Sequence, residues 1–297
     1  MAAWLNVPLL ARVALVDDPE TIRFLNAAPG VDRAFTGRGP LINRWLQRRV
    51  SRDLRTRRGA LPAFLPRDDA GRREAQAALA ARLDEIEVDA IAAESEVSAL
   101  GAAVAGAQAE DEIGRLLQTV LGRLFAEDFT ATPETWTAAK TIDGYPRLDP
   151  LRAAWARGSG RLGRALRAVS EPLGEDPHAV HAVSIAVHNI HRSLLAMRDA
   201  LAYPVERARL DEERVALRCL RAPAASLRVL TDPTQLPFRQ TPAPVGTLLV
   251  FRLRKAAEAR LDDATAFAAG EWSACPAQGY VRHLLRAVWR RAREATT

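Results

Sequence analysis

Proline is absent from residue 71 to residue 129, and this long stretch is rich in alanine and leucine. Leu79, Leu83 and Ile86 recur at helical spacing, and apolar residues from Ile113 to Leu124 repeat the pattern. Side chains three or four residues apart share one face of an α-helix. The stretch therefore predicts two or three consecutive helices, and a chain organised in this way folds mainly as helix.

Proline also marks where other helices begin. Pro19, Pro133 and Pro177 each follow an Asp or Thr, a pairing typical of a helix N-terminus. They predict helices that start near residues 20, 134 and 177, the last of them running to about residue 202. Apolar periodicity adds helices from residue 151, over 207–220 and, at the end, over 279–293.

Short β-branched and apolar runs predict a small amount of sheet. The runs lie at residues 13–16, 226–230 and 247–251, and a loop is expected over 262–275. The fold class is thus mainly α with a small β portion. We expect a single domain over 1–297 with three regions: a strand and helix region at 1–70, a helical half at 71–222, and a β segment, cysteine loop and last helix at 223–297.

Composition limits the class of protein. Hydrophobic residues make up 48% and charged residues 26%, which is typical of a globular protein. No run of apolar residues approaches the 18 that a membrane-spanning helix needs, and the N-terminus lacks the cationic start of a signal peptide. Two cysteines, Cys219 and Cys275, are too few for a disulfide framework. These features predict a reduced, cytoplasmic protein without a membrane partner.

The net charge of +6 raises the question of nucleic-acid binding. Only two of the 42 basic residues are lysines, and the arginines are spread along the chain among acids. Aromatic residues make up 6%, which is sparse for a platform that stacks bases. We therefore expect no nucleic-acid partner.

One cysteine lies where chemistry is expected. Cys275 ends a glycine-containing loop and is followed by Pro276 and the last predicted helix. Backbone amides at a helix start favour a negative group, so the position supports a thiolate, and a thiolate is a strong axial ligand for haem iron. The alternative is that Cys275 is a small buried hydrophobe.

The order of motifs around this cysteine resembles the cytochrome P450 superfamily of haem-thiolate enzymes. In that family a loop F-x-x-G-x-R-x-C-x-G carries the ligand cysteine into the last long helix, and here Phe267, Gly270 and Cys275 match, with Ala277 at the last glycine. Further resemblances occur in the family's order. They are an opening strand and helix (13–26), a haem-edge helix starting at 71–73, a long helix crossing the haem (177–202), an E-x-x-R-like helix (215–218) and a later strand (244–250).

Several positions depart from the family pattern. Val215 replaces the glutamate of E-x-x-R, so its ion pair with Arg218 is lost unless Glu212 or Glu213 substitutes. Ser273 stands where an arginine normally meets a haem propionate, and Cys275 lies one residue further from the start of the motif. On the long helix, residues 186–190 replace the acid and alcohol used for oxygen activation. Family members are also normally longer, so the resemblance implies a truncated form.

The resemblance implies haem b (iron-protoporphyrin IX) as the cofactor and oxidation of a small organic substrate by a monooxygenase or peroxide-dependent reaction. A ferredoxin-type electron donor or peroxide would be the co-reactant. The implied roles are iron ligand for Cys275, propionate contacts for Arg228 and Arg72, and further haem contacts for Phe267 and Trp272. The implied ceiling above the iron is His188, Asn189 and Arg192. The alternative is a non-catalytic scaffold or partner protein that has the same fold and has lost haem.

Four of the five histidines fall on the predicted helix 177–202. They are His178, His181, His188 and His191, and on a regular helix they cover an arc of about 140°. Imidazoles at this spacing bind transition metals, and a helical histidine metal-binding protein is a third alternative. A partly solvated helix face and the lining of a cofactor pocket are the other interpretations.

Overall fold

Two strands near the N-terminus pair with strands that follow residue 225. In the computed structural model, which describes residues 2–260, 263–268 and 272–296, they form a five-stranded sheet of order β1-β2-β7-β6-β3. Neighbouring strands are antiparallel except β2 and β7, which are parallel, with Val16 opposite Phe251. The strands are β1 (Ala2–Val7), β2 (Ala11–Val16), β3 (Val31–Asp32), β6 (Ser226–Leu230) and β7 (Leu248–Phe251), and β4 (Arg55–Thr56) and β5 (Gly59–Ala60) form a separate pair.

The chain forms two compact units. The sheet unit contains Met1–Leu54, Pro62–Gln76 and Ala222–Cys275, and the helical unit contains Arg55–Leu61, Ala77–Arg221 and Pro276–Thr297. Both units include residues from each of the three regions expected from the sequence. The organisation as a single domain stays a prediction.

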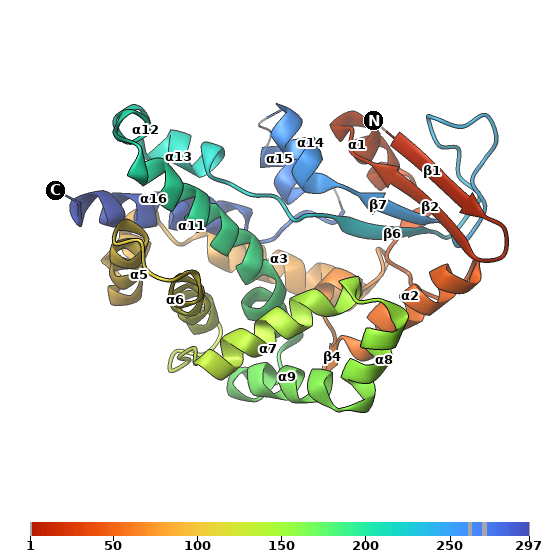
Figure 1. The fold of residues 1–297 in the computed structure, drawn as a ribbon, viewed down its shortest axis with the longest axis horizontal. Helices are drawn as coiled ribbons and strands as arrows, with labels where there is room; N and C mark the ends of the chain where they lie inside the picture. Colours follow the sequence, from red (N-terminus) through yellow and green to blue (C-terminus); the bar gives the residue numbers. More distant parts are fainter. Residues whose placement is uncertain (1, 261–262, 269–271, 297) are drawn as a thin grey trace. The chain divides into compact units, whose positions relative to one another are not determined.

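Helices make up most of the described chain (Figure 1). No helix in the described ranges is long and apolar enough to cross a bilayer. The first nine helices are α1 (Pro19–Ala27), α2 (Leu41–Asp53), α3 (Ala70–Asp84), α4 (Val88–Ala93), α5 (Ser95–Ala105), α6 (Glu110–Arg123), α7 (Pro133–Gly144), α8 (Pro150–Gly158) and α9 (Arg161–Ser170). They are followed by α10 (Pro177–His181), the π-helical segment η4 (Ala182–Ala186), α11 (Val187–Ala202), α12 (Pro204–Arg209), α13 (Glu212–Arg218), α14 (Leu253–Arg260), α15 (Asp263–Phe267) and α16 (Gln278–Glu294). Three short 3₁₀ turns, η1 (Pro62–Phe64), η2 (Tyr145–Arg147) and η3 (Glu171–Leu173), complete the list.

The core of the sheet unit lies between α1 and one face of the sheet. Ala14, Val16 and Phe251 project from the strands and are almost fully buried, and Leu25 of α1 packs in the same cluster. The alternation of buried and exposed residues in β2 matches the two-residue period of a strand. A second, smaller cluster includes Val50 of α2.

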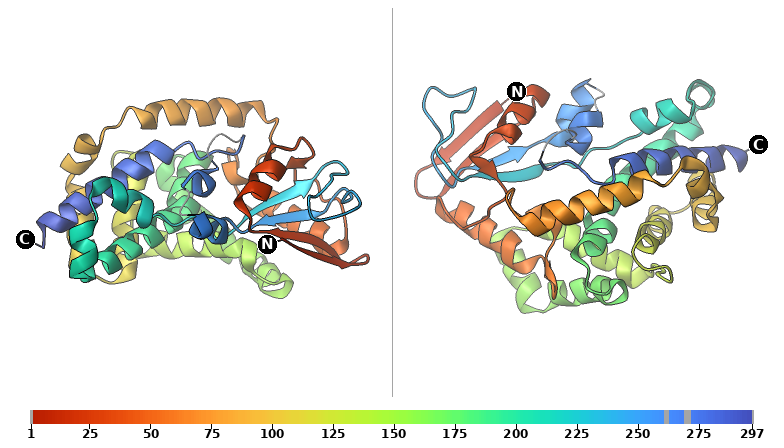
Figure 2. Two further views of the ribbon diagram at one scale, coloured as in Figure 1. Left: turned by 90° about the horizontal axis from the view of Figure 1, so that it is seen from above. Right: turned by 180° about the vertical axis from the view of Figure 1, so that it is seen from behind.

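The last helix, α16, is the central packing element of the helical unit (Figure 2). It runs beside α5 and also contacts α4 and α13. The approach to α5 is close at Gly101, where an added Cβ would lie 2.5 Å from the Cβ of Arg291. Only a residue without a side chain allows the two helices to pack at this distance.

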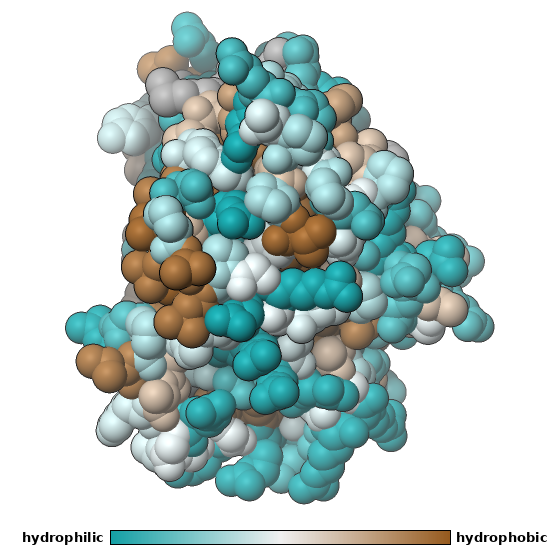
Figure 3. Space-filling model, turned by 90° about the vertical axis from the view of Figure 1, so that its right-hand side faces the viewer, coloured by the Kyte–Doolittle hydropathy of each residue, from teal (hydrophilic) through white to brown (hydrophobic). Residues whose placement is uncertain are grey.

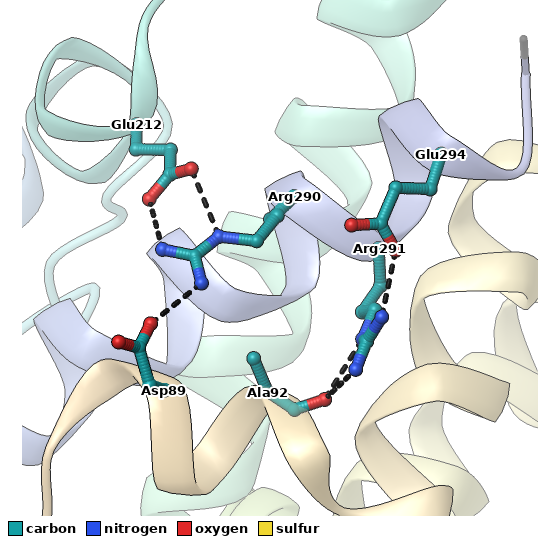
Figure 4. Close-up of polar contacts among 6 residues, drawn as sticks. All are labelled: Asp89, Ala92, Glu212, Arg290, Arg291 and Glu294. Atoms are coloured by element: carbon teal, nitrogen blue, oxygen red, sulfur yellow. Dashed lines mark hydrogen bonds and ion pairs between the residues drawn. The ribbon is translucent and has the colours of Figure 1, made fainter.

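Ion pairs on the same helix connect it to its neighbours (Figure 4). Arg290 donates to both carboxylate oxygens of Glu212 in α13, at 3.0 and 2.9 Å, and to Asp89 in α4 at 2.7 Å. These hydrogen bonds, chiefly those that Glu212 accepts, raise the pKa of Arg290 above its ordinary value. Arg291 donates to the carbonyl of Ala92, which closes the last turn of α4. Side-chain bonds thus hold three helices at one end of the unit.

Most of the predicted elements are confirmed. The caps Asp18, Thr132 and Asp176 each accept a backbone N–H in the first turn of their helices. The strands at 13–16, 226–230 and 247–251 are present, and the predicted helix over 177–202 is continuous as α10, η4 and α11. The fold class, mainly α with a small β portion, is also confirmed.

Three predicted segments were wrong, and two elements were not predicted. The stretch 71–129 forms four helices rather than two or three, and one of the turns uses Ala107 at φ +50°. The helix predicted over 207–220 is two helices, because Asp211 caps a new one by accepting the Arg214 N–H. The loop expected over 262–275 contains α15. Strand β1 and helix α2 were not predicted.

We expect Arg290→Gln to lower the free energy of unfolding by about 1 kcal/mol, because a networked and partly exposed charge pair is worth about that much. Urea denaturation followed by circular dichroism measures the change. Arg293→Gln is the matched control, since Arg293 lies exposed on the same helix. Equal losses for the two variants, or a loss that is insensitive to salt, would contradict the role of the network.

Candidate functional site

The loop that carries Cys275 is closed by a backbone hydrogen bond. The N–H of Cys275 donates to the carbonyl of Phe267, the last residue of α15, at 2.8 Å. Ala268 adopts a left-handed conformation with φ +51°, which turns the chain, and Gly270 of the sequence motif lies outside the described residues. Phe267 is buried and Cys275 is partly exposed. Helix α16 begins at Gln278, three residues after the cysteine.

Asn26, at the end of α1, fixes the residues just before the cysteine. Its carbonyl accepts the indole N–H of Trp272 at 2.8 Å, and its side-chain amide donates to the hydroxyl of Ser273 at 3.0 Å. Arg228 of β6 donates to the side chain of Asn26 at 3.1 Å and to the Ser273 hydroxyl at 2.9 Å. The network is buried, so each of its bonds orders the loop.

Four guanidinium groups surround the ring of Trp272. Their central carbons lie 5.1 Å (Arg33), 5.9 Å (Arg67), 5.2 Å (Arg72) and 5.3 Å (Arg228) from the ring centroid. Cation–π attraction operates at these distances and holds the positive charges against the indole. The arrangement concentrates positive charge within the sheet unit, beside the cysteine loop. We call these four residues the arginine cluster.

The nearby carboxylates only partly balance the arginine cluster. Asp32 uses one oxygen to accept the backbone N–H groups of Arg33 and Arg67, and Asp69 accepts the backbone N–H of Arg72. The Nε atom of Arg33 is buried and has no hydrogen-bond partner in the described structure. Burial, with a smaller contribution from Arg72, lowers the pKa of Arg33 to about 10. A site with a spare, desolvated N–H donor and excess positive charge favours an anion such as a carboxylate.

Arg72 contributes charge but uses most of its donors within the protein. Its guanidinium donates to the carbonyls of Pro66, Arg67 and Trp272 and to the side chain of Gln76, at 2.9–3.2 Å. Burial lowers its pKa despite the neighbouring carboxylates. Arg72 therefore positions the loop around Trp272. Arg67 donates from Nη1 to the carbonyls of Ala27 and Ala28, at 3.2 and 3.4 Å, whereas the Nε donor of Arg33 has no partner in the described structure.

Several solved structures are similar to this chain over nearly its whole length. CYP154C4 from Streptomyces sp. W2061 is 15% identical, with a TM-score of 0.60 and coverage of 98% of this chain and 83% of that chain. Cytochrome P450-153 from Novosphingobium aromaticivorans is 14% identical (TM-score 0.59; 99% and 85% covered). The mycinamicin VIII C21 methyl hydroxylase MycCI from Micromonospora griseorubida is 16% identical (TM-score 0.59; 98% and 86% covered). No protein-family model and no curated protein sequence matches the chain.

The chain has the cytochrome P450 fold. The match extends over nearly the whole chain, so the resemblance inferred from the motifs is confirmed at the level of the fold. The arginine cluster and Cys275 are therefore parts of a P450 fold, and the residues proposed for its helical half can be located.

Two of the four histidines pack against a tryptophan of this P450 fold. The ring centroids of His188 and His191 lie 4.8 and 5.3 Å from that of Trp136 in α7. The Nε2 atom of His191 donates to the carbonyl of Glu110 at 2.8 Å, which places the proton on that nitrogen. Both imidazoles are buried, in contact with Trp136 of α7, on a helix that packs against α6. His188 thus packs against Trp136, and its Nε2 atom is buried without a hydrogen-bond partner in the described structure. Its role at the ceiling above the iron stays a prediction.

The π-helical segment η4 separates the two pairs of histidines. A π turn holds one more residue than an α turn, so it rotates the downstream helix by about 100° relative to a regular α-helix. His178 and His181 precede the segment and are partly exposed, whereas His188 and His191 follow it and are buried. No group of three metal-ligating side chains occurs among the residues that the structure describes. Because η4 inserts a residue between the two pairs, the arc of about 140° calculated for a regular helix was wrong.

The other two residues expected at the ceiling, Asn189 and Arg192, are partly buried on α11. The carbonyl of Asn189 accepts the hydroxyl of Ser193 at 3.0 Å. Their catalytic role stays a prediction. Helix α11 belongs to the helical unit and Cys275 to the sheet unit.

The E-x-x-R-like segment differs from the family pattern as the sequence indicates. Val215 is fully buried and Arg218 is exposed at the end of α13. Glu212 and Glu213 do not simply take the missing glutamate's place, because both pair with arginines of α16. The glutamates therefore connect α13 to the last helix.

Sequence reasoning missed Asn26, Arg33 and Arg67. Each comes from a separate segment and none belongs to a motif, so only the folded chain brings them to Trp272. The only signal in the sequence is that Asp32 precedes Arg33 and Pro66 precedes Arg67, two residue types common in turns.

We expect acid to destabilise the helical unit through His188 and His191. Burial lowers the pKa of both imidazoles below the ordinary 6.5. Below pH 6.5 the unfolded chain takes up protons that the folded chain does not, so stability falls as the pH falls, by up to about 2 kcal/mol per histidine at pH 5. His188→Phe keeps the ring against Trp136 and should flatten this slope. Denaturation curves between pH 8 and pH 5 measure it. An unchanged slope in the variant, with Asn189→Ala as the non-titrating control, would contradict the assignment.

Proposed function

We propose that this chain is a haem-thiolate oxidoreductase that oxidises a small organic substrate. The P450 fold over nearly the whole chain gives the class. The observation that carries the proposal is the arginine cluster beside the cysteine loop. It holds more desolvated positive charge than its carboxylates balance and includes a buried, unpartnered N–H.

The residues present fit haem b. A haem has two propionates, and bidentate guanidinium–carboxylate pairing is strong in a desolvated site. Arg33 has a donor for this role, Arg67 adds charge beside it, and Arg72 and Arg228 add charge and hold the loop. Cys275 is partly exposed at the end of that loop, as an iron ligand must be. The buried Phe267 accepts the backbone hydrogen bond that closes the loop. The ring of Trp272 holds the arginine cluster together.

When bound, haem supplies the activation of dioxygen or peroxide for oxygen transfer. The role of Cys275 is to hold the iron as a thiolate, which must be deprotonated to do so. The backbone bond from Cys275 to Phe267 fixes the direction of the loop, and the Asn26 and Arg228 contacts limit its movement. Preorganisation of this kind keeps the ligand sulfur in one geometry.

Proton delivery would depend on Asn189 and Arg192, since the acid and alcohol of the family are missing and His188 packs against Trp136. An amide side chain does not ionise and a guanidinium keeps its proton at neutral pH, so neither residue can serve as an acid there. This composition favours peroxide, which brings its own protons, over a ferredoxin-type electron donor. The substrate is proposed to be a small organic molecule, as in the family.

A non-catalytic scaffold is the second candidate. It is favoured by the Ser273 hydroxyl, which is already satisfied by Asn26 and Arg228, where the family places an arginine for the cofactor. Val215, which is buried where the family has a glutamate, removes the usual ion pair, and this also favours the scaffold. The two candidates differ in one property, which is saturable haem binding.

The test is reconstitution of the full chain with haem, followed by absorption spectroscopy. We expect a Soret band that saturates at one haem per chain, and a ferrous–CO spectrum with the red shift of thiolate ligation. Cys275→Ala should abolish the red shift. Cys219→Ala is the matched control, because Cys219 is buried at the end of α13 and should leave the spectrum unchanged. Absence of a saturable Soret band would favour the scaffold.

The arginine cluster gives a second prediction. Arg33→Gln removes a donor without removing the iron ligand, so the CO spectrum should keep its red shift while haem affinity falls roughly tenfold, the value of one charge-assisted hydrogen bond. Haem titration measures the dissociation constant. Arg23→Gln is the control, since Arg23 lies exposed on α1. Equal affinities for wild type and Arg33→Gln would refute the propionate role of the arginine cluster.

A further inference from the structure

The outer face of the sheet unit carries a group of exposed leucines. Leu5 and Val7 of β1 and Leu15 of β2 are 36–54% exposed. The turn between the strands adds Leu9 and Leu10, and the start of α2 adds Leu41 and Ile42. Apolar side chains gather on the side of the molecule shown in Figure 3. We call these seven residues the leucine patch.

Leu9 is an unfavourable residue for the turn position that it occupies. The turn places Pro8 at its second position and Leu9 at its third, where φ is +61°, and closes with a bond from the Leu10 N–H to the Val7 carbonyl at 3.0 Å. This position of a type II turn favours glycine or asparagine. Leu9 is also 90% exposed. Neither folding nor hydration is improved by leucine here, so its side chain points to a function outside the fold.

The leucine patch is held rigidly. The carbonyls of Leu9 and Leu10 accept the N–H groups of Leu41 and Ile42, at 3.0 and 2.9 Å, and so satisfy the first turn of α2. Asn43, fully buried, donates to the carbonyl of Arg12 and accepts its N–H, which fixes α2 to β2. The exposed side chains therefore form a preorganised surface.

The two segments that form the leucine patch are basic. Residues 2–16 and 34–52 contain six arginines and no Asp or Glu. Arg44, Arg48 and Arg52 are exposed and spaced four residues apart, so they follow one side of α2 from Leu41. Arginine pairs well with phosphate, because its planar group donates two parallel hydrogen bonds.

We propose that the leucine patch and its arginines dock this protein on an anionic lipid surface, in contrast to the absence of a membrane partner expected from the composition. Leucines entering the interface between headgroups and acyl chains, with arginines on the phosphates, are the combination used by peripheral membrane proteins. A second copy of the chain is disfavoured, because a symmetric contact would bring arginine against arginine. Strand addition at β1 would leave Leu9, Leu10 and the leucines of α2 uncovered. This inference does not depend on haem.

The test is sedimentation of the full chain with vesicles of phosphatidylcholine alone or with phosphatidylglycerol. We expect binding to the anionic vesicles that weakens with salt, and weaker binding to the neutral ones. Leu9→Asn should reduce binding about tenfold while keeping or raising thermal stability, because asparagine tolerates φ +61°. Arg44→Gln combined with Arg48→Gln should reduce binding to anionic vesicles by about fivefold per arginine.

Leu151→Asn is the matched control, since Leu151 is 83% exposed on α8, outside the leucine patch, and should leave binding unchanged. Three results would overturn the proposal: no binding to anionic vesicles, equal binding by wild type and Leu9→Asn, or an equal loss in Leu151→Asn. A dimer that Leu9→Asn dissociates, without vesicle binding, would instead assign the patch to a second copy.

Discussion

Like charges packed against one indole ring are the constraint on which the sheet unit depends. Bringing guanidinium groups out of water is costly unless their N–H donors find acceptors. Arg72 and Arg228 meet this need with carbonyls and side chains of the loops around Trp272, so the same bonds that stabilise the charges also order the segment before Cys275. Arg33 keeps an unmet donor. Arg72 and Arg228 thus use their donors to order the structure, whereas Arg33 keeps a donor for a ligand. A preorganised anion site requires this combination.

The helical unit shows how a missing ion pair is compensated elsewhere. Where the family's E-x-x-R glutamate would stand, Val215 packs in the core and needs no partner. Glu212 lies nearly one turn earlier and reaches Arg290 of α16 with both oxygens. Because α13 and α4 share this arginine, the position of the last helix depends on a partly exposed pair rather than a buried one. Such a pair costs less to desolvate and is more sensitive to salt.

The elements predicted correctly are those whose signals are local. Asp18, Thr132 and Asp176 cap helices with their own side chains, so the sequence alone locates the helix starts. Helix α2 has no such cap: Pro40 precedes it, and its first N–H groups bond to the turn at Leu9. Its start is therefore specified by tertiary structure. The fold class and Cys275 loop were within reach of motif analysis, whereas the arginine cluster, assembled from distant segments, was not.

The histidines show why residue type and spacing do not identify a site by themselves. Their spacing on one helix was correct, but the inserted residue of η4 changes the phase between the first pair and the second. The second pair then meets Trp136, whose indole N–H donates to Asp111 at 2.8 Å, and burial lowers the pKa of both imidazoles. A neutral ring packed on an aromatic ring has little freedom to move toward a ligand. The π turn itself is the feature with functional implications, since such turns occur often at functional sites and open the backbone of a helix locally. Asn189 and Arg192 follow this segment on α11 and are partly buried.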